Sequence, residues 1–82
     1  DVDGIEVYSE VEGEIDFIIK EGNTLYPIEI KETRSPKAAM AKEFDVLDKD
    51  LGTHRGMGVI LCSYPEKLYL RDNLVCLPLE YI

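Results

Sequence analysis

Two neighbouring stretches, Glu14-Ile15-Asp16-Phe17-Ile18-Ile19 and Pro27-Ile28-Glu29-Ile30-Lys31, decide how this chain of 82 residues folds. Both are rich in β-branched and apolar residues, which favours strands, and Glu21-Gly22-Asn23 between them is typical of a hairpin turn. Each strand nevertheless carries charged side chains among its apolar residues. Because an unpaired charge is costly to bury, such side chains lie either on a solvated face or around a compensating group such as a metal ion.

The two-residue repeat of a strand places the charged side chains of this hairpin on one face. The predicted faces are Ile15, Phe17 and Ile19 against Glu14, Asp16 and Ile18 in the first strand, and Tyr26, Ile28 and Ile30 against Pro27, Glu29 and Lys31 in the second. Pro27 has no amide hydrogen, so we expect it at the strand entry or at a point paired on one side only. Across adjacent strands, Asp16 then comes within reach of Glu29 and Lys31.

The remaining elements follow from periodicity and turn residues. We expect a strand from Ile5 to Glu12, a helix from about Pro36 to Leu51, a buried strand from Met57 to Ser63, and one or two short strands at Lys67–Leu70 and Val75–Leu79. Ser35-Pro36 is typical of a helix start and Gly52 of a helix end. The sequence therefore predicts an α/β (α+β) fold: a mixed, mostly antiparallel sheet of about five strands with one covering helix.

Composition indicates one soluble globular domain spanning residues 1–82. Hydrophobic residues make up 45% and charged residues 32% of the chain, and no apolar run is long enough for a membrane span. The chain starts at Asp1 without an initiator Met or a secretion leader, so we expect a piece of a larger protein. Cys62 and Cys76 then favour a reduced, cytoplasmic protein over a disulfide, and they lack the partners of a zinc site.

Charge is segregated along the chain. The net charge of −8 argues against a broad basic surface for nucleic acid, yet seven acids and no base fall within residues 1–16. The segment 31–42, by contrast, holds four of the nine basic residues. At the expected helix start, Arg34, Ser35 and Lys37 are candidates to hold a phosphate, although simple capping with exposed basic side chains explains them as well.

The candidate site consists of Asp16, Glu29 and Lys31. Carboxylate oxygens suit Mg²⁺ or Mn²⁺, which keep several waters and use one or two protein carboxylates. A neighbouring lysine can orient or deprotonate a water, or steady charge that develops on a phosphate. Two simpler interpretations stay open: a solvated polar face, and a plain β-rich domain without a site.

The order of these elements carries a resemblance. A strand, a hairpin with Asp16, a strand with Glu29-Ile30-Lys31, a helix and a buried strand resemble the core of the PD-(D/E)xK nuclease-like superfamily, whose fold is restriction-endonuclease-like. More narrowly, the two quoted stretches are similar to the C-terminal domain, of unknown function, found in many prokaryotic AAA+-type ATPases. The resemblance covers most of the chain and implies a C-terminal, nuclease-like fragment of a larger protein.

The resemblance implies a Mg²⁺- or Mn²⁺-dependent hydrolysis of phosphodiester bonds in DNA. Asp16 and Glu29 would hold the metal, and Lys31 would assist the attacking water. The implied partner is an upstream ATPase domain of the same chain, in the cytoplasm, and a homo-oligomer is left open. Active members often have a helix with another acid before the first strand, and nothing helical precedes Ile5. The alternative is therefore a catalytically inactive regulatory or protein-interaction module that retains the fold.

Overall fold

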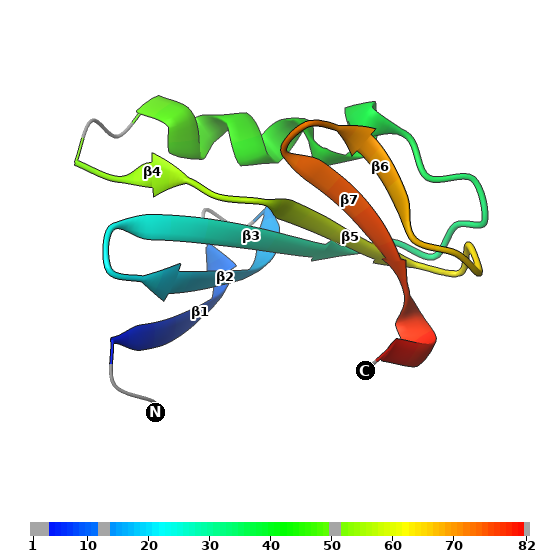
Figure 1. Ribbon diagram of the computed structural model, residues 1–82, viewed down its shortest axis with the longest axis horizontal. Helices are drawn as coiled ribbons and strands as arrows, with labels where there is room; N and C mark the ends of the chain where they lie inside the picture. The colour runs from blue at the N-terminus through cyan, green and yellow to red at the C-terminus, as the bar shows by residue number, and fades with distance from the viewer. Residues whose placement is uncertain (1–3, 12–13, 50–51, 82) are drawn as a thin grey trace.

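The computed structural model describes residues 4–11, 14–49 and 52–81. They form one seven-stranded sheet, a helix that lies across one of its faces, and a short helical turn near the C-terminus (Figure 1). The elements are β1 (Ile5–Val11), β2 (Ile15–Glu21), β3 (Thr24–Ile30), η1 (Ala38–Lys49), β4 (His54–Arg55), β5 (Gly58–Cys62), β6 (Leu68–Arg71), β7 (Leu74–Pro78) and η2 (Leu79–Tyr81).

The sheet is mixed, with the order β1-β2-β3-β5-β7-β6 and β4 paired to β3. β1–β2, β2–β3 and β6–β7 are antiparallel, whereas β3–β4, β3–β5 and β5–β7 are parallel. The α+β class with one covering helix is confirmed. The expected count of about five strands is wrong, because β4, at two residues, is too short to show a period. The mostly antiparallel pairing is also wrong, because η1 is a crossover that makes β3 and β5 parallel.

The hairpin between β2 and β3 forms where its turn residues predict it. Glu21 pairs with Thr24, and Gly22 adopts a φ of 59°, a left-handed conformation that glycine reaches without strain. This hairpin fixes which residues of β2 and β3 lie opposite each other.

Pro27 is fully buried in the middle of β3 and is paired on one side only, as predicted. On the β2 side it lies opposite Ile18. On the other side, Leu25 pairs with Arg55 and Ile28 with Val59. Between these pairs, the three residues 56–58 lie opposite the two residues Tyr26 and Pro27, so the neighbouring segment contains one extra residue. The missing amide of the proline therefore falls where the neighbouring strand is interrupted.

The core lies between η1 and the sheet. Phe44 of η1 packs with side chains that are almost completely buried: Ile15, Ile18, Ala41, Ile60, Cys62, Leu74 and Cys76. Cys62 and Cys76 are free thiols inside this core, and burial raises the pKa of Cys76. β5 is buried along most of its length, as its continuous apolar run predicts.

The helix starts later than predicted. η1 has 3₁₀ geometry with a non-helical backbone at Ala41 (φ −113°, ψ 23°), and its first turn is marked by the N–H of Met40 donating to Lys37 O at 3.0 Å. Ser35 therefore does not cap it; the Ser35 N–H instead donates to Thr33 Oγ1 at 3.0 Å, which closes a separate turn. The predicted end at Leu51 lies outside the described residues. Neither described helix is long and apolar enough to cross a membrane.

Arg55 fastens η1 to the sheet, a role that the sequence did not suggest. Its guanidinium donates to the carbonyl of Phe44 at 3.2 Å, lies 5.3 Å from the centre of the Phe44 ring and pairs with Asp48 at 3.7 Å. Burial lowers the pKa of Arg55 from its ordinary value and Asp48 opposes the shift, so the guanidinium stays charged at neutral pH. The helix is thus held by apolar packing and by one largely buried cation.

Close packing at the start of β5 predicts that Gly58→Ala destabilises the protein. A Cβ at this position would lie 2.8 and 2.9 Å from two carbons of the Phe44 ring. We expect a loss of about 1–3 kcal/mol in the free energy of unfolding, measured by urea denaturation. In a Phe44→Leu background the additional cost should fall below about 1 kcal/mol. An equal cost in both backgrounds would show that the ring is not the obstacle.

Candidate functional site

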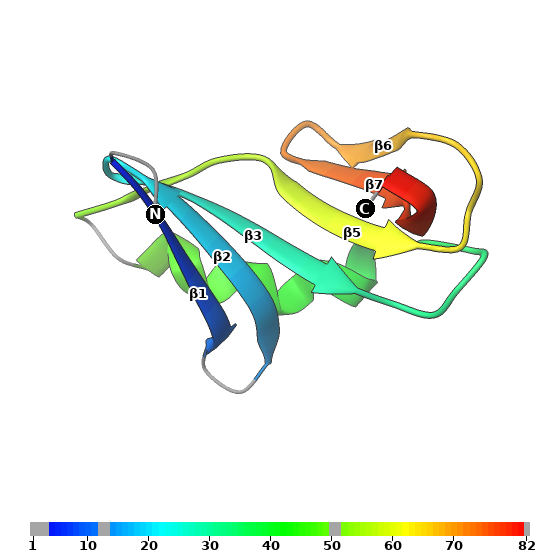
Figure 2. The same cartoon turned by 90° about the horizontal axis from the view of Figure 1, so that it is seen from below.

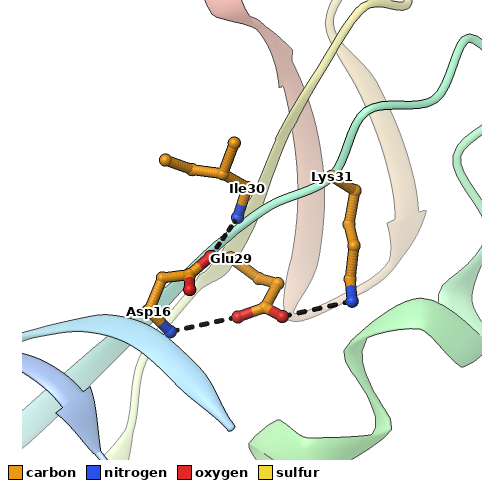
Figure 3. A network of polar contacts seen from close by, with 4 residues as sticks. All are labelled: Asp16, Glu29, Ile30 and Lys31. Carbon is orange, nitrogen blue, oxygen red and sulfur yellow. Dashed lines mark hydrogen bonds and ion pairs between the residues drawn. The ribbon is translucent and has the colours of Figure 1, made fainter.

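β2 and β3 bring Asp16 and Glu29 together where their ladder ends. The last backbone pair of the ladder is Phe17–Ile28. Beyond it, the N–H of Asp16 donates to Glu29 Oε1 at 3.0 Å, and the N–H of Ile30 donates to Asp16 Oδ2 at 2.8 Å (Figure 3). Two reciprocal bonds from side chain to main chain therefore continue the connection between the strands.

The hydrogen-bonding alternation of the hairpin explains why Ile30 needs this carboxylate. In an antiparallel ladder every second residue directs its N–H toward the partner strand, and Ile30 is two residues beyond Ile28. Its N–H thus points toward β2, where it meets the Asp16 carboxylate. The local distortion also places Ile15 and Ile18 in the same core, although strict alternation predicted opposite faces for them.

Glu29 is the buried charge of the site. Only 7% of its surface is exposed, and Lys31, two residues further along the same face, places its Nζ 3.2 Å from Glu29 Oε2. Figure 3 shows the Glu29 carboxylate between the main-chain nitrogen of Asp16 and the ammonium of Lys31. The backbone N–H of Lys31 donates to Leu61 O of β5 at 2.9 Å, which fixes the lysine at the end of β3. The charge on Glu29 is thereby compensated from both sides.

The three predicted residues are brought together, and the two carboxylates among them are oxygen ligands of the kind that a divalent cation takes. Neither reciprocal bond uses Oδ1 of Asp16, and each carboxylate oxygen of Glu29 has more than one lone pair. Across the described parts of the chain, no group of three His, Cys, Asp or Glu side chains could hold a metal ion. A cation here would have two protein carboxylates and several waters, which is a common arrangement for Mg²⁺.

The candidate phosphate ligands Arg34, Ser35 and Lys37 lie in the loop after β3 and are exposed. Thr33 anchors this loop, because its N–H donates to Lys31 O and its carbonyl accepts from Ser63. No described contact joins the three candidates to Asp16 or Glu29. They lie on a loop that continues directly from Lys31, and their binding of phosphate stays a prediction.

A shallow hollow that the sequence did not indicate lies at the carboxyl ends of β5 and β7. Its volume is about 200 Å³, and it is lined by Cys62, Ser63, Pro65, Pro78, Leu79 and Glu80. The carboxyl ends of parallel strands commonly carry ligand sites. The hollow could be predicted only by knowing which strands lie parallel to β5, and the sequence does not specify them.

A family model described as "Domain of unknown function (DUF4143)" matches residues 3–82. No curated protein and no solved structure matches the chain.

Asp16→Ala and Asp16→Asn should separate the structural role of Asp16 from its charge. We expect Asp16→Ala to lose about 0.5–1.5 kcal/mol of unfolding free energy, because the N–H of Ile30 loses its acceptor at an exposed position where water replaces it in part. Asp16→Asn keeps an acceptor oxygen and should lose clearly less. Urea denaturation measures both, and hydrogen exchange of the Ile30 amide should accelerate in Asp16→Ala alone. Equal losses in the two variants would mean that the hydrogen bond is not what stabilises the end of the ladder.

Proposed function

The chain belongs to the DUF4143 family, and on that premise we propose that it is a divalent-metal-dependent, nuclease-like domain that hydrolyses phosphodiester bonds. The observation that carries the proposal is the convergence of Asp16, Glu29 and Lys31 at the end of the β2–β3 ladder. The crossover from β3 through η1 to β5 supports a restriction-endonuclease-like assignment of the fold. We further propose an ATPase domain of the same longer protein as the partner of this domain.

In this proposal Asp16 and Glu29 hold Mg²⁺ or Mn²⁺. The bound cation would supply a water of lowered pKa and would neutralise charge on the phosphate. The protein contributes position: the Ile30 amide fixes one carboxylate, and the Asp16 amide fixes the other. A site held in this way needs little rearrangement during the reaction.

Lys31 is placed to act on the water or the phosphate. Its ammonium pairs with the buried carboxylate, and its side chain is 37% exposed, compared with 9% for that of Glu29, so this ion pair lies at the boundary between the core and solvent. An ammonium there can orient a water molecule by hydrogen bonding and stabilise negative charge on the phosphate.

DNA binding would have to be local. The net charge of −8 repels a polyanion, and the basic segment from Lys31 to Lys42 is the part of the chain that counteracts this repulsion next to the site. Exposed Arg34 and Lys37 are therefore the proposed contacts to substrate phosphates. Few phosphate contacts imply a shallow dependence of affinity on salt.

The second candidate function is a catalytically inactive regulatory or protein-interaction module. The observation that favours it is that both oxygens of Glu29 and Oδ2 of Asp16 already have partners within the protein. These contacts give the charged residues a complete structural role without a metal. The two candidate functions differ in whether the site takes up a cation and cleaves a phosphodiester.

Metal binding is tested by titrating the protein with Mn²⁺ and with Mg²⁺ in a calorimeter. We expect saturable binding that Asp16→Asn and Glu29→Gln each weaken at least about tenfold, because each variant removes one of two charged ligands. Asp16→Asn retains the acceptor for the Ile30 amide, so lost binding would not be a consequence of unfolding. Glu14→Gln, a neighbouring exposed position, is the control and should bind as the natural sequence does. Binding that is absent, or unchanged in Asp16→Asn, contradicts the metal site.

Catalysis is tested by nicking of supercoiled plasmid in Mg²⁺, with the longest natural form of the protein. Lys31→Ala should cut at least about 100-fold more slowly while still binding Mn²⁺, if Lys31 acts on the water or the phosphate. Equal inertness of the natural sequence and Lys31→Ala, with metal binding intact, supports the inactive module. Undiminished cutting by Lys31→Ala removes the proposed role of the lysine.

A further inference from the structure

β1 is one outer edge of the sheet, and its free backbone groups can be identified. Within the described residues it pairs with β2 alone. The N–H of Gly22 donates to Gly4 O at 3.3 Å, which marks residues 4 and 22 as a hydrogen-bonded pair. Because such pairs alternate along an antiparallel ladder, Ile5, Val7 and Ser9 occupy the intervening positions. Their N–H and C=O groups therefore point away from β2.

The edge is open as well as unpaired. Residues 6–9 are all exposed, and Figure 2 shows β1 as the outermost strand beside β2. Edge strands are usually protected by short length, by proline or by charged side chains, above all lysine. β1 has seven residues and contains neither proline nor lysine, and its charged residues are Glu6 and Glu10.

The two faces of β1 differ in chemistry. Val7, 65% exposed, lies beside Ile19 on the face that points away from η1. On the opposite face Tyr8 is exposed, and its hydroxyl donates to Glu6 Oε2 at 2.8 Å. A strand added along this edge would place alternate side chains beside an apolar row and beside a carboxylate.

The acidic charge of the hairpin indicates which kind of segment the β1 edge could bind. From residue 5 to residue 21 the sequence has six acidic side chains and one basic side chain, Lys20. A second copy pairing through its own β1 would place like charges across the new ladder, which is destabilising. An extended segment with lysine or arginine at alternate positions would place opposite charges there instead.

We propose that the β1 edge binds an extended segment of a partner protein as an added strand, with apolar side chains alternating with lysine or arginine. Main-chain hydrogen bonds to Val7 and Ser9 supply the affinity in this mode, and the alternating side chains supply the specificity. The surface lies on a different strand from Glu29 and Lys31 and does not depend on the proposed nuclease function.

The proposal is tested with a fluorescein-labelled probe peptide, Thr-Lys-Val-Lys-Val-Lys-Thr. Fluorescence anisotropy should show binding that is at least about tenfold weaker for the same peptide with glutamate in place of lysine. In hydrogen exchange, the Val7 and Ser9 amides should exchange faster than those of Glu6 and Tyr8 in the free protein. On peptide binding, the Val7 and Ser9 amides should slow at least about tenfold.

Val7→Pro and Val7→Thr form the matched pair of variants. Proline removes an outward N–H without removing a ladder bond, so the fold should persist while peptide affinity falls at least about tenfold. Threonine keeps the N–H and the β-branch and should bind as valine does. Any one of three results would overturn the proposal. They are undiminished peptide binding by Val7→Pro, unchanged amide exchange at Val7 and Ser9 on peptide addition, and equal affinity for the lysine and glutamate peptides. Concentration-dependent protection of these amides without peptide would do the same, because it would show a second copy on the edge.

Discussion

The carboxylate of Glu29 is the constraint on which the arrangement of this molecule depends. An ionised group with 7% exposure is tolerated only when it is paired and hydrogen-bonded, and here the Asp16 amide and the Lys31 ammonium perform this task. The hydrogen bond from the Asp16 amide requires the β2–β3 ladder to stop at a particular register. The ion pair with the Lys31 ammonium requires the chain to continue past Ile30 along β5, where the Lys31 N–H donates to Leu61 O. A single buried charge thus links the hairpin to the parallel half of the sheet.

Asp16 combines two roles that are usually separate. It replaces a ladder bond at the end of the hairpin, which is a structural role, and in the proposed function it would be the second metal ligand beside Glu29, which is a chemical one. The structural role alone accounts for its presence, so an acidic pair of this kind is not by itself a sign of catalysis. What supports the proposed chemistry is Lys31, whose ammonium pairs with the buried carboxylate although its side chain is 37% exposed.

Local patterns in the sequence predicted local structure well. The hairpin, its turn and the meeting of Asp16 with Glu29 and Lys31 all depend on residues fewer than twenty positions apart. What could not be predicted depends on how the elements pack against one another, whatever their separation in the sequence. Three features arise from tertiary packing and leave no period in the sequence: the parallel pairing of β5 with β7, the two-residue β4, and the contact of Arg55 with the Phe44 ring. The Ser35-Pro36 signal failed because the first helical turn, marked by the Met40 N–H donating to Lys37 O, begins two residues beyond Ser35.

The register of the sheet also sets the order in which its parts can close. Glu21 and Thr24 are three residues apart, whereas Ile28 and Val59 are 31 apart, so closing the β3–β5 connection costs about 2 kcal/mol more chain entropy. Asp16 and Glu29 both belong to the short-range half and can approach while still in water. Glu29 lies in register with Ile60 of β5, so its place in the sheet is complete only when the strand pairing with the largest sequence separation has formed. The position of this charge thus depends both on the local hairpin and on the most distant strand pairing.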